Sequence, residues 1–488
     1  MQSPTRRAFL KSAAAAFAAC TATAAPRRPP NILFICTDDQ APWALRHGGN
    51  AAAHTPNIDA LCATGTYFPN MFVTTPVCSP SRASTMTSRY GSEVGITDWI
   101  DPRKEPELGL AETFTTWPSL LADAGYQTAL IGKWHLGTQD AFHPTKRGFQ
   151  HFTGFRAGGT KPVDPELEVN GELKVHTGVT DEILNQYAID QLNAFDTSKP
   201  FLLNVHYRWP HSPWQPLPEE DWALYKDANP PIPNPEFPNL DVERATKMMK
   251  EYLAACAGVD RLVGDLLRAL DETGRADDTI VIFTSDNGYN MGHNGMWHKG
   301  NGHLLTRDVA GIPGNDPRVA RPNLYDNSLR VPTAIRWPGV SVPGSRVDET
   351  ISILDWLPTI LSMANIDMPR GLVHRGRDFT PLFRGKGRRW NNDLYAEYSQ
   401  HHYTVAALRM YRTPEWKLIR DFARDGKDEL YDLVNDPAEG RNLIDDPVAQ
   451  AIRKQLDAKL LARMKTLTGA RSSREGGRPR PLPKDSPG

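Results

Sequence analysis

The sequence lacks the features that mark several common classes of protein. Only five of its 488 residues are cysteine, and Cys36, Cys62, Cys78 and Cys256 lack the paired spacing of zinc sites or disulfide frameworks. The 56 basic and 57 acidic residues leave a formal net charge of -1, which provides no broad positive field for nucleic acid or an anionic membrane. Any anion that the protein binds must therefore meet a local site.

The first 25 residues read as a targeting segment. Arg6 and Arg7 precede an alanine-rich run and the small residues 22–24, the order of a twin-arginine export signal. The apolar part is shorter than the roughly 20 residues that span a bilayer, so we predict no transmembrane span. We predict that the twin-arginine machinery exports the chain to the periplasm or the medium. The alternatives are a frayed basic N-terminus before a short buried helix, and a lipid anchor at Cys20.

Short apolar runs alternate with helical patterns through most of the chain. A strand is expected at 31–36, a helix from Thr55 to Gly65, and an extended segment at 67–72. Strands that alternate with helices indicate an α/β domain with a mainly parallel sheet, which we place at 26–370. The expected helix and strand pairs that follow are 117–124 with 127–132, 181–195 with 201–207, and 242–272 with 279–284.

The pattern changes near residue 369. Isolated extended pieces at 393–399 and 416–420 precede a helical pattern near 449–465, which predicts a small C-terminal α+β domain over 371–468. The last segment, 469–488, is rich in Arg, Ser, Gly, Pro and Lys and is predicted to be disordered. With 40% hydrophobic residues, the chain has enough apolar content for two cores.

Unusual polar residues follow the predicted strands. In parallel sheets, ligands bind outside the carboxyl ends of the strands, so these residues predict a site there. Carboxylate and amide oxygens are suitable ligands for Ca²⁺ or Mg²⁺. Asp-Asp at 38–39 alone, or Asp-Asn-Gly at 286–288 alone, is also typical of a turn. On an extended segment, residues two apart face the same side, which is expected for Lys133 and His135. The remaining residues of this predicted site are Asp38, Asp39, His211, Asp286 and Asn287.

Cys78 opens the sequence Cys-Ser-Pro-Ser-Arg, which ends at Arg82. A thiol needs a lowered pKa or a nearby base to act as a nucleophile, and here helix-starting residues and an arginine follow it. The residues alone leave two interpretations: a nucleophile at a helix N-terminus and a buried structural cysteine. Cys36, Cys62 and Cys256 are expected to be small buried hydrophobic residues.

The Cys-x-Pro-Ser-Arg motif resembles that of the type I sulfatases, in which this cysteine is oxidised to formylglycine. The resemblance covers essentially the whole chain after the first segment. It implies an α/β fold of the alkaline-phosphatase and sulfatase type, in which a large mixed, mainly parallel sheet is flanked by helices. Further matching motifs lie at 30–33 with 38–39, 55–59, 132–137, 210–213, 285–288, 297–299, 330–332, 336–339, 429–432 and 436–437.

The resemblance also implies a mechanism for hydrolysis of sulfate esters. A formylglycine-generating enzyme would convert Cys78, and the hydrated aldehyde would attack sulfur. His211 would protonate the leaving alcohol, and His135 would remove the proton whose loss expels sulfate. Arg82 would hold the hydrate, while Lys133 and Lys299 would hold the sulfate oxygens. One calcium ion is expected on Asp38, Asp39, Asp286, Asn287 and the modified residue 78.

Other residues have weaker claims on this site. His206 is read as structural, whereas His293 and His298 flank the Lys299 motif and are candidates for substrate contact. The segments 300–321 and 398–403 are candidates for shaping the pocket. The alternative for 398–403 is an exposed edge of a sheet.

The expected substrate is a sulfated polysaccharide or oligosaccharide, with no role for nucleic acid. Two other functions compete with this one. One is hydrolysis of phosphate or phosphonate monoesters, and the other is non-catalytic carbohydrate binding if Cys78 stays unmodified.

Overall fold

The computed structural model describes residues 28–313, 316–385 and 390–469. The predicted export signal, Cys20 and the predicted tail beyond residue 469 lie outside the described residues.

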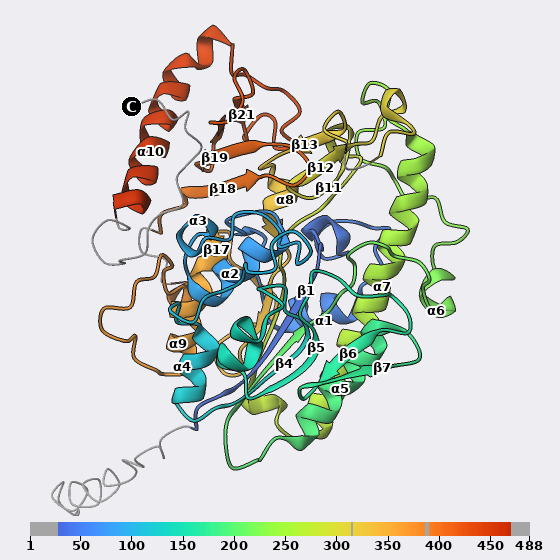
Figure 1. Ribbon diagram of the computed structural model, residues 1–488, viewed down its shortest axis with the longest axis vertical. Helices are drawn as coiled ribbons and strands as arrows, with labels where there is room; N and C mark the ends of the chain where they lie inside the picture. The colour runs from blue at the N-terminus through green and yellow to red at the C-terminus, as the bar shows by residue number, and fades with distance from the viewer. Residues whose placement is uncertain (1–27, 314–315, 386–389, 470–488) are drawn as a thin grey trace, which may run out of the picture.

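A ten-stranded sheet runs through the centre of the molecule (Figure 1) in the order β16-β2-β15-β9-β1-β8-β4-β5-β6-β7. Its five central strands are parallel, and the strands toward both edges are mainly antiparallel. The parallel strands are β1 (Asn31–Thr37), β4 (Gln127–Lys133), β5 (His151–Phe155), β8 (Phe201–His206) and β9 (Thr279–Ser285). The outer strands are β2 (Thr66–Tyr67), β6 (Glu166–Val169), β7 (Glu172–Val175), β15 (Ala334–Arg336) and β16 (Ser345–Arg346).

Helices cover both faces of this sheet because the central strands are apolar on both sides. In β1, Leu33 and Ile35 face a core formed with α1 (Pro56–Thr64), α5 (Thr180–Ala194) and α7 (Val242–Glu272). Successive side chains of a strand point to opposite faces. The other residues of β1, such as Phe34, therefore pack against the opposite layer, which consists of α2 (Cys78–Thr87), α4 (Trp117–Asp123) and α9 (Trp356–Met363).

Most predicted helices and strands begin and end within one or two residues of the observed ones, but the prediction of one extended segment at 67–72 was wrong. The extended segment 67–72 divides between β2 and β3 (Met71–Phe72), and β3 belongs to a separate three-stranded sheet with β14 (Arg330–Val331) and β17 (Ile351–Ser352). Thr55 occupies the N-cap position of α1, but its hydroxyl does not cap the helix. That hydroxyl instead donates to the Asp59 carboxylate at 3.1 Å.

The smaller C-terminal region is a four-stranded antiparallel sheet covered by a long helix (Figure 1). Its strands are β18 (Leu394–Gln400), β19 (Ala406–Arg412), β20 (Trp416–Asp421) and β21 (Glu429–Asp432), and its helix is α10 (Gln450–Gly469). Another antiparallel sheet contains β10 (Asn290–Met291), β11 (Met296–His298), β12 (Asn301–Leu304) and β13 (Ala320–Pro322). The short helices are α3 (Gly91–Val94), α6 (Glu219–Trp222) and α8 (Asp326–Leu329).

A buried ion cluster joins the C-terminal sheet to the larger region. Lys417 of β20 is fully buried, and its ammonium group pairs with Asp326 of α8 and with Glu439. Arg412 of β19 adds a second contact to Asp326, with 3.0 Å between its guanidinium and the carboxylate. The two regions are thus held together by charges that water does not screen.

We expect Lys417→Met to lower the free energy of unfolding by about 3–5 kcal/mol, because it leaves buried carboxylates without their cation. Urea unfolding measures this loss. Lys459→Met is the matched control, since the Lys459 side chain is 50% exposed in its pair with Asp393 and should contribute less than about 1 kcal/mol. Equal effects of the two variants would contradict a stabilising role for the cluster.

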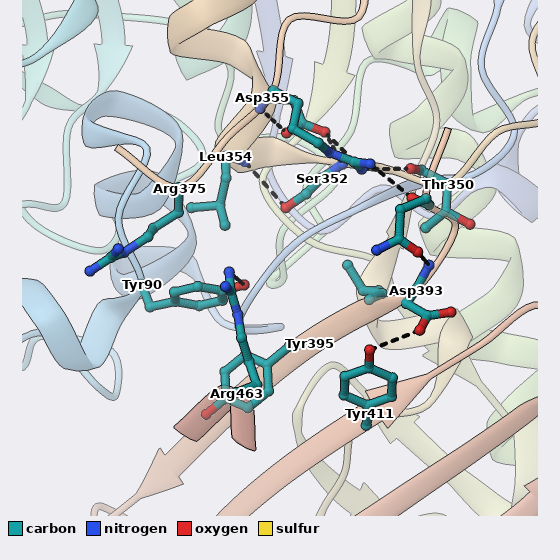
Figure 2. Close-up of a pocket in the computed structure, with 13 residues that line it drawn as sticks. Tyr90, Thr350, Ser352, Leu354, Asp355, Arg375, Asp393, Tyr395, Tyr411 and Arg463 are labelled. Carbon is teal, nitrogen blue, oxygen red and sulfur yellow. Dashed lines mark hydrogen bonds and ion pairs between the residues drawn. The ribbon is translucent and has the colours of Figure 1, made fainter. Parts of the chain in front are cut away.

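A cavity of about 280 Å³ lies beside the C-terminal sheet (Figure 2). Arg463 of α10 reaches toward the Tyr90 hydroxyl, with 3.3 Å between them. Arg375 is paired with Glu93, and Asp393 accepts a hydrogen bond from Tyr411. Cys78 is the first residue of α2, and Tyr90 comes shortly after the last residue of this helix. Because α2 has 10 residues, this cavity is about 15 Å of helix away from Cys78.

Candidate active site

The acidic residues that follow two neighbouring strands meet at the carboxyl edge of the sheet. β1 and β9 pair in parallel, with Thr37 opposite Ser285, so Asp38 and Asp39 leave the sheet beside Asp286. The Asp39 amide donates to the Asp286 carboxylate at 3.2 Å. All three carboxylates are buried, and one oxygen of each lies within 4.8 Å of one oxygen of the others.

This cluster has the chemistry of a hard cation site. The buried Asp39 Oδ2 and Asn287 Oδ1 have no hydrogen-bond donor in the described part of the chain. Burial, and then the charge of Asp38, raise the pKa of Asp286 to about 8 despite the neighbouring Arg82. A divalent cation would relieve this repulsion and use the free oxygen lone pairs. The residues therefore fit the ion that the sequence predicts.

Cys78 is the first residue of α2 and lies against this cluster. Its sulfur is 2.8 Å from the Lys299 ammonium and 3.7 Å from Asp38 Oδ1. Burial raises the pKa of the Cys78 thiol, but Lys133 and Lys299 outweigh burial and hold that pKa below its ordinary value. The thiol is thus buried among charged groups rather than in an apolar core.

Arg82 lies one helical turn after Cys78, on the same side of α2. Its guanidinium donates to Asp286 Oδ2 at 2.9 Å and to the main-chain carbonyl of Lys133 at 3.0 Å. Ser81 donates its hydroxyl to the main-chain carbonyl of Asp286. The helix that carries Cys78 is therefore fixed directly to the acidic strand end.

The two predicted lysines face the same cluster. Lys133 ends β4 and its ammonium group pairs with Asp38, while Lys299 follows β11 and pairs with Asp39. Burial opposes the ionisation of Asp38, but Lys133, His211 and Lys299 hold its pKa well below the ordinary range. Two cations thus lie beside the carboxylates and beside Cys78.

His135 lies near Lys133 for a reason that differs from the predicted one. β4 ends at Lys133, and His135 has a left-handed φ of 59°, so the two residues are not on one extended strand. His135 Nε2 is 3.1 Å from the main-chain carbonyl of Ile100. A Cβ added to Gly158 would lie 2.5 Å from this nitrogen, so only glycine allows the ring to sit there.

His211 lies beside Asp39 and is partly open to solvent. Its Nε2 is 3.8 Å from Asp39 Oδ2, and its Nδ1 is 2.6 Å from the main-chain carbonyl of Ser212. Burial lowers the pKa of His211, but Asp38 and Asp39 outweigh burial and raise that pKa above its ordinary value. The ring is therefore suited to carry a proton.

A cavity of about 410 Å³ opens above these residues and is lined by Cys78, His135, His211 and Lys299. Trp99 and Arg103 also line it, from the loop that precedes α4. The predicted nucleophile, both predicted histidines and Lys299 therefore line the same cavity, next to the buried carboxylates.

Comparison with known families identifies the family to which the chain belongs. A family model described as Sulfatase matches residues 30–366, and one described as N-sulphoglucosamine sulphohydrolase, C-terminal, matches residues 320–466. The chain belongs to the sulfatase family. It is a type I sulfatase of the alkaline-phosphatase-like superfamily, an enzyme that hydrolyses sulfate esters.

Two curated relatives extend along most of this sulfatase. The ulvan-active sulfatase of Formosa agariphila is 30% identical and covers 91% of this chain and 83% of its own. The N-acetylglucosamine-6-O-sulfatase of Bacteroides thetaiotaomicron is 26% identical, with 85% of this chain and 82% of that one covered.

Solved sulfatase structures confirm the predicted α/β fold. The structure of BT4656 in complex with its substrate D-glucosamine-2-N,6-O-disulfate has a TM-score of 0.78 at 23% identity, covering 91% of this chain and 99% of that one. Ps i-CgsB in complex with k-i-k-neocarrahexaose has a TM-score of 0.72 at 25% identity, covering 90% and 92%. In the described part of this sulfatase, no helix is long and apolar enough to cross a membrane.

The secondary candidates of the sulfatase divide into two groups. His298 lines the cavity, as do Asn301 from the segment 300–321 and Tyr403 from the segment 398–403. His293 instead packs against Trp43, with 5.1 Å between ring centroids, and does not line the cavity. His206 is buried in β8, within 3.3 Å of Arg82.

Sequence reasoning missed two groups near the predicted catalytic residues. The Ile100 carbonyl contacts His135, but a main-chain atom leaves no signal in residue types. Gln40 follows Asp39 and is fully buried, and its side-chain amide has no partner among the described residues. The position of Gln40 directly after the acidic pair was the available signal for it.

Proposed function

We propose that this sulfatase removes sulfate from a sulfated polysaccharide or oligosaccharide, with residue 78 present as formylglycine and with one bound calcium ion. The observation that supports this most is the position of Cys78. It begins a helix, contacts Lys299 and lies against a buried cluster of three carboxylates. An ordinary structural cysteine has no need of two buried lysines nearby.

Asp38, Asp39, Asp286 and Asn287 would hold the calcium ion together with residue 78. When present, the ion and the hydrated aldehyde supply an acidified hydroxyl as the nucleophile. Lys133 and Lys299 bind the sulfate oxygens and offset the charge that builds up on them. Arg82 keeps α2 fixed to Asp286, so the reacting atom stays in place.

The two histidines act on different protons. His211 carries a proton above Asp39 and donates it to the departing alcohol, whose alkoxide is a poor leaving group. His135 is held neutral, because burial and then Lys133 lower its pKa well below the ordinary value. It therefore accepts the proton from the second hydroxyl of residue 78, which expels sulfate.

The carbohydrate substrate is supported by the relatives. One is named for activity on ulvan and another for N-acetylglucosamine-6-O-sulfate. Maturation would require a formylglycine-generating enzyme, and we propose that residues 1–25 direct export through the twin-arginine machinery. The protein would then act in the periplasm or outside the cell.

Mass measurement of the peptide containing residue 78, followed by a screen of sulfated and phosphorylated sugars, tests this function. We expect an aldehyde at residue 78 and release of sulfate. An intact thiol without turnover would favour the carbohydrate-binding function. Faster release of phosphate than of sulfate would favour a phosphate monoester hydrolase.

We expect His211→Ala to slow hydrolysis of sugar sulfates far more than hydrolysis of an activated aryl sulfate. A phenolate with a low pKa leaves without protonation, whereas a sugar alkoxide does not. The difference should be on the order of 10²-fold or more, the usual contribution of a general acid. Steady-state kinetics with both esters measures it, and equal losses would contradict the acid role.

We expect His135→Ala to slow all substrates toward one common rate, because the step that it impairs comes after the alcohol has left. A sulfate-sized mass increase should then remain on the peptide that contains residue 78. Rapid quenching and mass spectrometry measure this increase. Strong dependence on the leaving group, with no mass increase, would assign His135 to the first step instead.

A further inference from the structure

The loop before α4 connects His135 to the C-terminal sheet. Within this loop, Ile100 contacts both His135 and the first turn of α2. The Ile100 carbonyl lies 3.1 Å from His135 Nε2, and the Ile100 amide donates to the Ser79 hydroxyl at 3.0 Å. Ser79 is the residue after Cys78 in α2. The position of one peptide segment therefore affects both the base and the helix that carries the nucleophile.

The Ile100 carbonyl also fixes which nitrogen of His135 is the base. A carbonyl oxygen only accepts hydrogen bonds, so the neutral ring must carry its proton on Nε2. The lone pair is then on Nδ1, which is buried and has no partner among the described residues. A ring that lost this contact would be free to change tautomer or to rotate, and the free lone pair would move.

Asp98, two residues before Ile100, anchors the loop. Its side chain is fully buried, and four donors converge on its two oxygens. Three of these donors belong to the C-terminal region. The Tyr398 hydroxyl donates to Oδ1 at 2.9 Å, and the main-chain amides of His401 and His402 donate to Oδ2 at 2.9 and 3.3 Å. A carboxylate with this many donors holds a single position.

The ring of His402 strengthens the same junction. Its Nε2 donates to the main-chain carbonyl of Trp99 at 2.8 Å, and its ring lies 4.2 Å from the Trp99 ring. Because both oxygens of Asp98 already have two donors each, this group of residues acts as a hydrogen-bonded joint.

We propose that Asp98 and Tyr398 are positioning residues, through which the C-terminal sheet holds the Ile100 carbonyl against His135 and so fixes Nδ1 as the catalytic base. The proposal rests on the proposed role of His135. It makes the small C-terminal region part of the catalytic apparatus, although none of its strands carries a residue that takes part in proton transfer.

Asp98→Asn and Tyr398→Phe test the connection separately. An amide has one acceptor oxygen, so Asp98→Asn turns an NH₂ group toward two donors whichever way it is oriented. Tyr398→Phe removes one donor and leaves three. Tyr395→Phe is the matched control, because Tyr395 lies three residues earlier in β18 and its hydroxyl contacts Glu397 at 3.1 Å within the same strand.

A double-mutant cycle with His135→Ala gives the decisive measurement, because it isolates effects that run through His135. For an activated aryl sulfate, we expect kcat to fall about tenfold in Asp98→Asn and about threefold in Tyr398→Phe, because each variant removes only part of the hydrogen bonding to the Asp98 carboxylate. In the His135→Ala background the same changes should alter kcat less than twofold. Tyr395→Phe should have little effect in either background.

Losses of equal size in both backgrounds would overturn the proposal, as would no loss in either variant. If Asp98→Asn fails to fold, Tyr398→Phe alone decides the question. Nitrogen NMR of histidine-labelled protein supplies a readout independent of activity. The His135 signals, assigned by their loss in His135→Ala, should show an Nε2 proton in the wild type and mixed tautomers in Asp98→Asn. This comparison holds even if residue 78 is unmodified, so the two proposals fail separately.

Discussion

Cys78→Ala should lower turnover by more than about 10³-fold while leaving the fold intact, because it removes the reacting group itself. The side chain contributes one contact to Lys299 and one to Asp38, and neither holds α2 in place. Ser81 and Arg82 keep their contacts to Asp286 in the variant. Sulfate release measures activity, and thermal unfolding should show a change of only a few degrees.

Cys62→Ala provides the matched control for this experiment. Cys62 is fully buried in α1, within the apolar core on the other face of the sheet. The same change there creates a small cavity and should cost about 1 kcal/mol of stability, with no effect on kcat. Cys78→Ser adds a second control. A serine side chain carries one hydroxyl, whereas the hydrated aldehyde carries a second one whose proton can be removed to expel sulfate. Sustained turnover by Cys78→Ala or Cys78→Ser would refute the formylglycine mechanism.

The sequence predicted the sheet and its helices because their signals are local. Apolar runs of strand length, and helical patterns such as those at 55–65 and 242–272, identify the elements without knowledge of their neighbours. The parallel order of β1 and β9 then brings Asp38 and Asp286 together, although they are far apart in the sequence. The acidic cluster could therefore be predicted from strand ends alone.

Other features depend on contacts that no local pattern encodes. Asp98 and Tyr398 are 300 residues apart. The segment 398–403 was a candidate for shaping the pocket, but no local pattern connects it to Asp98. The Ile100 carbonyl that faces His135 is a main-chain atom, so the residue type gives no indication of it. The left-handed φ of His135 replaced the extended geometry expected from spacing, because β4 ends at Lys133. Tertiary packing determined each of these.

The carboxylate cluster predicts a large response to removal of the metal ion. Asp38, Asp39 and Asp286 are buried next to one another, and their repulsion is least when a divalent cation lies between them. An ion at 100 times its dissociation constant stabilises the folded state by about 2.7 kcal/mol. Treatment with a chelator should therefore lower the melting temperature by roughly 3 °C, because the unfolding entropy grows with chain length, and it should abolish turnover.

Adding ions back to the chelated protein distinguishes calcium from magnesium. Calcium should restore the melting temperature at the lower concentration, because a site of several carboxylates and an amide suits a large ion that sheds its water easily, whereas magnesium keeps its water. Asn287→Ala removes the neutral ligand without changing the charge, so it should raise the calcium concentration needed for half-restoration. Asn442→Ala, at an exposed asparagine of the C-terminal region, should leave that concentration unchanged. If the chelated wild-type protein keeps both its melting temperature and its activity, Asp38, Asp39, Asp286 and Asn287 are strand-end turn residues and hold no ion.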